Sequence, residues 1–249
     1  MKLQARRVAG WLATGALLAG GLAGGWGAPA RAAAVPDFNG TWRLAAPQAL
    51  LVPADGAPIP FTADGKASYE ANKALAGKGD YSFDATMTRC SSPGLPRLML
   101  TPMRFRIFQR PTIVAFSFEW NRLARQVDMP GSFTELHKMA ANYNDTVVGT
   151  MKGVTRGHWE GDTLVAESSQ FAYGKLLDNL VVGSDDLQLR ERFRLRNHDT
   201  LEDRITITDP QAFTRSWDAV LTYKRVADDA FPEDVCLDRR DAGQAPLPH

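Results

Sequence analysis

Three ionisable residues in the C-terminal part of the chain, Glu191, Asp203 and Arg215, stand within apolar patterns of β type. Two positions to either side of each one there is a Leu, Ile, Phe or Trp. Because successive side chains of a strand point to opposite faces, residues two apart share a face. The pattern therefore predicts that all three side chains face an apolar interior. A charge in such an interior must be neutralised by a partner or serve a function.

Two carboxyl groups beside a guanidinium in an enclosed space are suited to acid and base chemistry. Burial raises the pKa of a carboxyl, so Glu191 and Asp203 would exchange protons near neutral pH. Arg215 would hold a carbonyl or carboxylate oxygen of the substrate with its forked donors. This hypothesis is an isomerase, lyase or hydrolase reaction without a cofactor. Two alternatives stay open: a carrier whose charges only orient a ligand, and a structural barrel in which Glu191 and Arg215 form a buried ion pair.

Histidines and aromatic residues complete the predicted pocket. His137, in an irregular segment, is a candidate proton shuttle, and His158 stands just before a hairpin turn; each also has a purely structural interpretation. Apolar side chains from the strands would line the pocket around a small hydrophobic or amphipathic molecule, with core packing as the alternative. The predicted ligand-binding residues are Phe116, Phe118, Trp120, His158, Phe193 and Trp217.

The N-terminal 34 residues have the composition of a secretory signal peptide. Lys2, Arg6 and Arg7 precede an apolar run that ends in small residues. Glycines interrupt this run and it is short for a membrane span, with an uncleaved anchor as the alternative. We therefore predict cleavage near Ala34, a periplasmic or secreted bacterial protein, a single domain over 35–249 and no stable membrane insertion after cleavage. The adjacent arginines leave both the Sec and the twin-arginine routes open.

Several classes of partner and site lack their signatures. The leader holds four of the 29 basic residues, which leaves 25 against 28 acidic ones without a basic cluster, so a nucleic-acid partner is not expected. The chain has no His-x-His, His-Glu-x-x-His or Cys-x-x-Cys spacing, and we predict no metal site. It also lacks a Gly-x-Ser-x-Gly nucleophile motif and a Gly-rich phosphate loop. No cofactor is predicted.

Cys90 and Cys236 are the two cysteines of the chain. In an exported protein the expected arrangement is a disulfide, which would join the C-terminal tail to an early loop. Closing so long a loop contributes on the order of 4 kcal/mol in the chain-entropy model. A catalytic thiol and a metal ligand are the alternatives, and neither has a His or a second Cys nearby in sequence.

Successive hairpins would position these residues. Apolar alternation in the second half of the chain predicts strands that turn at Asn121-Arg122, Glu160-Gly161 and Asn197-His198-Asp199. The segment 62–76 is the one expected short helix, and 130–146, which lacks a clear period, would cross a barrel mouth. The predicted fold is all-β, an antiparallel barrel of about eight to ten strands with room for one small ligand.

Motifs along the chain resemble those of known barrels. Gly40-Thr41-Trp42 resembles the Gly-x-Trp entry of lipocalin-like barrels, whose Trp often stacks under a basic residue of the last strand; here Arg225 would serve. A wider set of motifs is similar to an uncharacterised family of exported bacterial lipocalin-like proteins. These motifs are Cys90, Gly94-Leu95-Pro96-Arg97, Trp159-Glu160-Gly161-Asp162-Thr163-Leu164-Val165, Glu191-Arg192-Phe193, Asp199-Thr200-Leu201-Glu202, Asp209-Pro210, Phe213-Thr214-Arg215-Ser216-Trp217 and Cys236.

The resemblance implies a single lipocalin-like domain and an exported location, but no reaction. The chain departs from the family pattern in two places. Ala166-Glu167-Ser168 stands where the family usually has Val-Asp-Thr, and Gly183-Ser184 where it often has His-Ser. If that His is functional in relatives, this protein has lost or replaced it.

Overall fold

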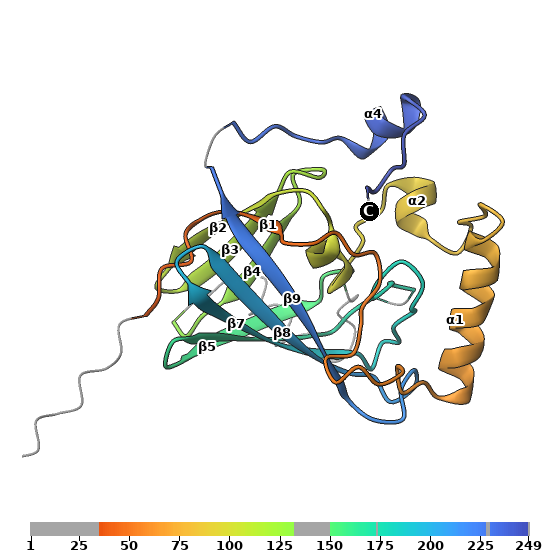
Figure 1. The fold of residues 1–249 in the computed structure, drawn as a ribbon, viewed down its shortest axis with the longest axis horizontal. Coiled ribbons are helices and arrows are strands. Elements are labelled where there is room, and N and C mark those ends of the chain that lie inside the picture. Colours follow the sequence, from red (N-terminus) through yellow and green to blue (C-terminus); the bar gives the residue numbers. More distant parts are fainter. Residues whose placement is uncertain (1–34, 132–149, 173, 228–229, 249) are drawn as a thin grey trace, which may run out of the picture. The chain divides into compact units, whose positions relative to one another are not determined.

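A computed structural model describes residues 35–131, 150–172, 174–227 and 230–248, in which nine strands close into a barrel (Figure 1). Neighbours in the chain are neighbours in the barrel, and the last strand pairs with the first. The strands are β1 (Gly40–Leu44), β2 (Phe105–Arg110), β3 (Ile113–Phe118), β4 (Ala124–Asp128), β5 (Val154–Glu160), β6 (Thr163–Ser169), β7 (Gln188–Asn197), β8 (Thr200–Thr208) and β9 (Trp217–Val226). The predicted all-β barrel and its number of strands are confirmed.

One strand pair departs from the antiparallel expectation. β4 and β5 pair in parallel, through Asp128 and Arg156. A parallel pair requires a crossover connection and cannot be made by a hairpin. The long segment between the two strands supplies that connection, and the predicted excursion over 130–146 falls mostly outside the described residues. The sheet is therefore mixed.

The predicted turns lie close to their expected positions. Asn121 and Arg122 turn the chain between β3 and β4, both with positive φ. His198 and Asp199 connect β7 to β8. Between β5 and β6 the pairing of Glu160 with Thr163 makes the loop Gly161-Asp162, one residue later than the prediction. These tight turns set the register that decides which side chains face inward.

The helices are more numerous than the single one expected. α1 (Ala63–Ala76) confirms that prediction, and the Thr62 side chain accepts a hydrogen bond from the Gly65 amide at its start. Three shorter helices are present in the described part of the chain: α2 (Ala85–Arg89), the 3-10 helix η1 (Arg97–Leu100) and α4 (Cys236–Asp241). α2 and η1 lie between the expected helix and the expected hairpins, where no element is predicted from the sequence.

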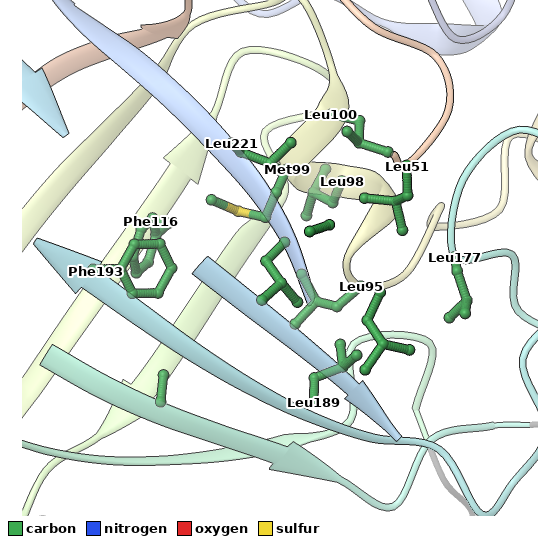
Figure 2. Close-up of a cluster of buried hydrophobic side chains, with 14 of the residues drawn as sticks. Leu51, Leu95, Leu98, Met99, Leu100, Phe116, Leu177, Leu189, Phe193 and Leu221 are labelled. Atoms are coloured by element: carbon green, nitrogen blue, oxygen red, sulfur yellow. The ribbon is translucent and has the colours of Figure 1, made fainter. Parts of the chain in front are cut away.

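The segment Gly94–Thr101, here called the plug, fills one end of the barrel interior. Leu95, Leu98 and Met99 are buried in the same core as the inward side chains of the strands. Figure 2 shows these side chains gathered near Leu221 of β9. A buried ion pair attaches the plug to α2. It joins Arg97 Nη2 of the plug to Oδ2 of Asp84, the N-cap residue of α2, at 2.6 Å. The plug therefore belongs to the core and is not a surface loop.

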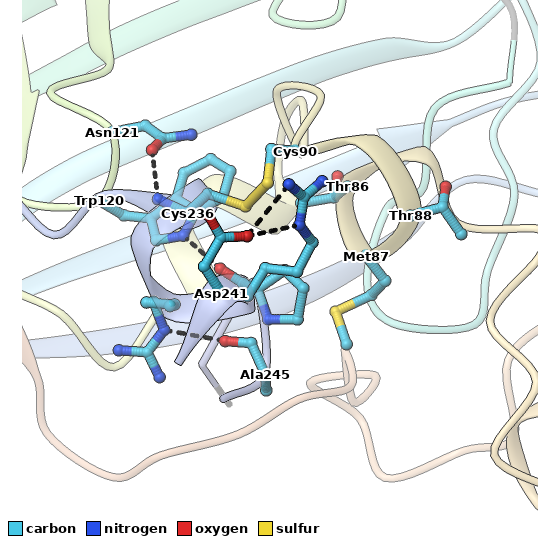
Figure 3. Close-up of a disulfide and its surroundings, with 12 residues drawn as sticks. Thr86, Met87, Thr88, Cys90, Trp120, Asn121, Cys236, Asp241 and Ala245 are labelled. Carbon is cyan, nitrogen blue, oxygen red and sulfur yellow. Dashed lines mark hydrogen bonds and ion pairs between the residues drawn. A yellow bond between two sulfur atoms is a disulfide. The ribbon is translucent and has the colours of Figure 1, made fainter. Parts of the chain in front are cut away.

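A second, smaller core lies at the disulfide (Figure 3). Cys90 and Cys236 are joined, as predicted, with their Cα atoms 5.8 Å apart. The Trp120 indole donates a hydrogen bond to the Pro246 carbonyl at 2.8 Å, and Leu247 packs against the same cluster. The C-terminal arm, residues 230–248, is thereby fixed to the end of β3 and to α2.

In the part of the chain that the structure describes, no helix combines the length and the apolar character that a membrane span needs.

Candidate functional site

The described interior of the barrel contains a cluster of ionisable side chains on three adjacent strands. Glu191 of β7, Asp203 of β8 and Tyr223 of β9 are all fully buried. Glu191 pairs with Ile205 in the ladder and Asp203 pairs with Phe193, so the two acids are diagonal neighbours on the inward face. Both acids thus point inward, as strand alternation predicts.

The cation beside Glu191 is Arg125 of β4, not the predicted Arg215. The Arg125 guanidinium forms a two-pronged pair with the Glu191 carboxylate, through Nη1 to Oε1 at 2.8 Å and through Nη2 to Oε2. Both side chains are at most 1 % exposed. Arg215 has 54 % of its side chain exposed and its guanidinium lies 3.6 Å from Asp55. The predicted role of Arg215 as an interior clamp is therefore wrong.

The error at Arg215 has a structural reason. β9 begins at Trp217, and the chain from Asp209 to Ser216 is irregular. Strand alternation does not extend backwards through such a turn, so the face of Arg215 could not be inferred from Trp217. Arg125, in contrast, lies inside β4, where Arg125 and Val127 are the two buried positions.

Aromatic rings surround the buried guanidinium. The Arg125 guanidinium carbon lies 5.2 Å from the centroid of the Phe116 ring and 5.7 Å from that of Phe193. These distances are within the range of cation–π attraction, which is strengthened away from water. The Arg125 Nε atom is buried and has no hydrogen-bond partner among the described residues. One N–H donor of the cluster is therefore unused.

Asp203 is the buried acid without a counterion of its own. Neither of its carboxyl oxygens has a hydrogen-bond donor within the described structure. Its pKa is raised well above the usual 3.8, first because burial removes water and second because the Glu191 charge repels a second negative charge. The Arg125 charge opposes this shift and does not reverse it. Burial and the nearby Glu191 charge therefore both favour the protonated, uncharged form of the Asp203 carboxyl.

Tyr223 connects this cluster to the plug. Its hydroxyl donates a hydrogen bond to the Met99 carbonyl at 3.1 Å. Burial raises the phenol pKa well above 10, and negative charge on the neighbouring acids raises it further. Tyr223 therefore remains protonated, and its one donor is used by the plug. This contact places the acids near the end of the barrel that the plug fills.

The predicted aromatic residues fall into two groups. Phe116, Phe118 and Phe193 are buried in the barrel core, and the Phe116 and Phe193 rings lie 5.4 Å apart (Figure 2). Trp217 is also in this core, in edge contact with the ring of Phe213. Trp120 belongs instead to the core at the disulfide, so its predicted place in the pocket is wrong.

Neither of the two histidines that were predicted for the site, His137 and His158, is placed beside the buried acids by the described structure. His158 has 43 % of its side chain exposed and lies 3.2 Å from the exposed Glu160 on the outer wall. Its predicted contact with an interior ligand is wrong, because its neighbours in β5 put its ring on the outer face. His137 lies outside the described residues, so its role stays a prediction.

The hollows found over the described surface lie away from the acids. Two adjoining hollows of about 530 and 600 Å³ share lining residues from β6, β7 and β8, and they are lined mainly by polar side chains. Two smaller ones lie at the C-terminal arm and beside Arg215. None of the four is lined by Glu191 or Asp203. Among the described residues no three His, Cys, Asp or Glu side chains are grouped as metal ligands.

Two functional candidates, Arg125 and Tyr223, were not predicted from the sequence. A signal for Arg125 was present, since Leu123, Arg125 and Val127 stand at alternate positions of a segment that was predicted as a strand. Tyr223 follows the same alternation in β9 but carries no charge to distinguish it from a core residue.

The chain matches no family model and no curated protein at a significant level. Among solved structures it is similar to a mutant of the fluorescent protein UnaG, with 14 % sequence identity and a TM-score of 0.33. The alignment covers 76 % of this chain and 96 % of the UnaG chain.

Proposed function

We propose that this protein binds one small, largely apolar molecule with an oxygen function inside its barrel. Asp203 carries the proposal. A buried polar group without a hydrogen-bond partner destabilises a folded protein by about 1 to 3 kcal/mol, so native structures rarely keep one without a use. A ligand that hydrogen-bonds to Asp203 removes this cost, and the surrounding phenylalanines suit an apolar body.

The test is to search for a molecule that stays with the protein through purification. The protein is denatured, extracted and analysed by mass spectrometry as wild type, Asp203→Leu and Glu202→Gln. Glu202 neighbours Asp203 in β8 but its side chain pairs with Arg196 on the outer wall, so its variant is the matched control. We expect the same molecule from wild type and Glu202→Gln, and at least a tenfold smaller amount from Asp203→Leu. Wild-type protein that neither carries a molecule nor binds an added one would overturn the proposal in favour of a barrel filled by its own side chains.

Acid–base catalysis on the same ligand is the second candidate function. Its support is the neutral Asp203 beside the carboxylate Glu191, an arrangement in which one group donates a proton and the other receives one. Incubating the extracted molecule with fresh protein distinguishes the two functions. A catalyst converts it and the Asp203→Asn variant does not, although that variant still binds. A carrier leaves it unchanged in both forms.

Export of the protein is part of the same proposal. The signal-like leader and the Cys90–Cys236 disulfide support it, because disulfides persist in oxidising compartments. N-terminal sequencing of the protein from separated cell fractions tests it. We expect a chain that begins near residue 35 in the periplasmic or secreted fraction, and an intact leader on cytoplasmic protein would contradict export.

A further inference from the structure

The described charges of the barrel interior already balance without a ligand. Arg125 and Glu191 neutralise each other through two hydrogen bonds. Burial and the Glu191 charge both favour the protonated form of Asp203. With Asp203 protonated, the cluster of these three residues has no net charge.

A charged ligand would upset this balance in either direction. A carboxylate would bring an uncompensated negative charge next to Glu191, where water is excluded and repulsion is strong. An ammonium group would meet the Arg125 cation, and it would find a counterion only if Asp203 released its proton to solvent. Two new charges would then have to be desolvated to form one ion pair, which usually gains little.

The unused hydrogen-bonding groups fit an uncharged oxygen. Arg125 Nε offers a donor, and the Asp203 carboxyl offers a donor and an acceptor. A hydroxyl oxygen can accept from one of these groups while its hydrogen is donated to another, and a carbonyl oxygen can accept from both. An ammonium group has no acceptor for the Arg125 N–H.

We infer that the barrel selects uncharged alcohols or carbonyl compounds and rejects carboxylates and amines with the same hydrocarbon skeleton. This inference rests on the proposed function, since it names the ligand class of the same interior site. The Arg125–Glu191 pair accounts for the rejection of acids. Because the Arg125 guanidinium is already neutralised by Glu191, it does not attract the carboxylate of a ligand.

Isothermal titration calorimetry with two matched probe series tests the inference. One series is 1-decanol, decanal, decanoate and decylamine, and the other is 1-naphthalenemethanol, 1-naphthaldehyde, 1-naphthoate and 1-naphthalenemethylamine, all at pH 7. We expect the alcohol or the carbonyl compound of at least one series to bind about tenfold or more tightly than the acid and the amine. An acid or amine that binds as tightly as the alcohol overturns the inference while the proposed function stands. Failure of all eight probes, together with the absence of a copurified molecule, overturns the proposed function itself.

A pair of variants tests the cause of the selectivity. In Glu191→Gln/Asp203→Asn the Arg125 charge has no buried partner, so we expect the preference to invert toward decanoate or 1-naphthoate. Asp203→Asn alone keeps Arg125 and Glu191 balanced, so the alcohol should bind more weakly than to wild type but still more tightly than the acid. If the double variant does not fold, the single variant decides, because a shift of its preference to the acid contradicts the charge-balance explanation.

Discussion

Asp203 is the residue at which stability and function oppose each other. Its carboxyl is fully buried, lies beside Glu191 and finds no donor among the described residues. Replacement of such residues commonly stabilises a protein while its function is lost. A barrel filled by its own side chains has no use for an acid at this position. The stability of Asp203 variants therefore tests that alternative even before a ligand is known.

Asp203→Asn should raise the free energy of unfolding, and more so as the pH rises. The folded state keeps the acid protonated above its usual pKa, whereas the unfolded state releases the proton near pH 4. Stability is therefore lost as the pH rises from the unfolded pKa toward the folded pKa, and Asn has no proton to release. Urea unfolding should show a gain of about 1 to 3 kcal/mol at pH 8 and a smaller gain at pH 4.5. A gain that is equal at both pH values would show that ionisation is not its cause.

Removal of the Arg125 guanidinium should be far more costly than removal of Arg215. Arg125→Met leaves the Glu191 carboxyl buried without its counterion, which costs about 3 to 5 kcal/mol. Arg215→Met breaks only an exposed pair and should change stability by less than about 1 kcal/mol. In the double variant Arg125→Met/Glu191→Leu most of the loss should be recovered, because no unpaired charge remains. Similar losses for the two single variants in urea unfolding would contradict the assignment of Arg125 as the interior cation.

Sequence alternation predicted the site where its residues lie inside long strands. β7 and β8 are long strands with regular pairing around Glu191 and Asp203, so the inward faces of these two acids could be inferred. Arg215 lies in the irregular segment before β9, where alternation gives no information. The pairing of Arg125 with Glu191 joins residues 66 positions apart across the barrel, and a sequence without related sequences has no signal for such a contact.

At the scale of elements, the plug was the main feature that the sequence did not reveal. The segment from Gly94 to Thr101 is short and rich in Pro, Gly and Leu, and its leucines have no period of their own. Their burial depends on the barrel around them, which only tertiary structure supplies. Long amphipathic elements were predictable for the opposite reason: α1 has its own cap at Thr62, and each hairpin has its own turn.

Gly94→Ala should loosen the plug. Gly94 has φ near +77°, and a Cβ atom built on it would lie 2.5 Å from the carbonyl oxygen of Met151. Gly161 also has a positive φ, near +63°, but a Cβ atom there meets nothing within 4 Å. Both Ala variants bear the backbone cost of about 1 to 2 kcal/mol, and only Gly94→Ala adds a clash with the backbone. Thermal unfolding should thus show a clearly larger loss for Gly94→Ala, and equal losses would mean that the approach of the plug to Met151 is unimportant.

At the scale of the whole molecule, closure of the barrel and attachment of the C-terminal arm are separate features. β9 completes the barrel by pairing with β1, and Arg225 on β9 stacks over the Trp42 ring at 4.2 Å, as the Gly-x-Trp resemblance implies. The arm that follows β9 has no strand in the described barrel and is held by the disulfide and by contacts around Trp120 (Figure 3). The sequence predicted the disulfide and the hairpins, but not the parallel β4–β5 pair, because the connecting segment lacks periodicity.

Removal of the disulfide should destabilise the protein without opening the barrel. Cys90 and Cys236 are 146 residues apart, so their bond restricts a large part of the unfolded chain and contributes about 3 to 5 kcal/mol. Cys90→Ser/Cys236→Ser should therefore lose roughly this amount in urea unfolding, while its circular dichroism spectrum keeps the β signal of the barrel, since neither cysteine lies in a strand. A reducing agent should lower the stability of wild type toward that of the variant and leave the variant unchanged. Loss of the β signal in the native variant would instead show that the arm is needed to hold the barrel closed, because the two features would then not be separate.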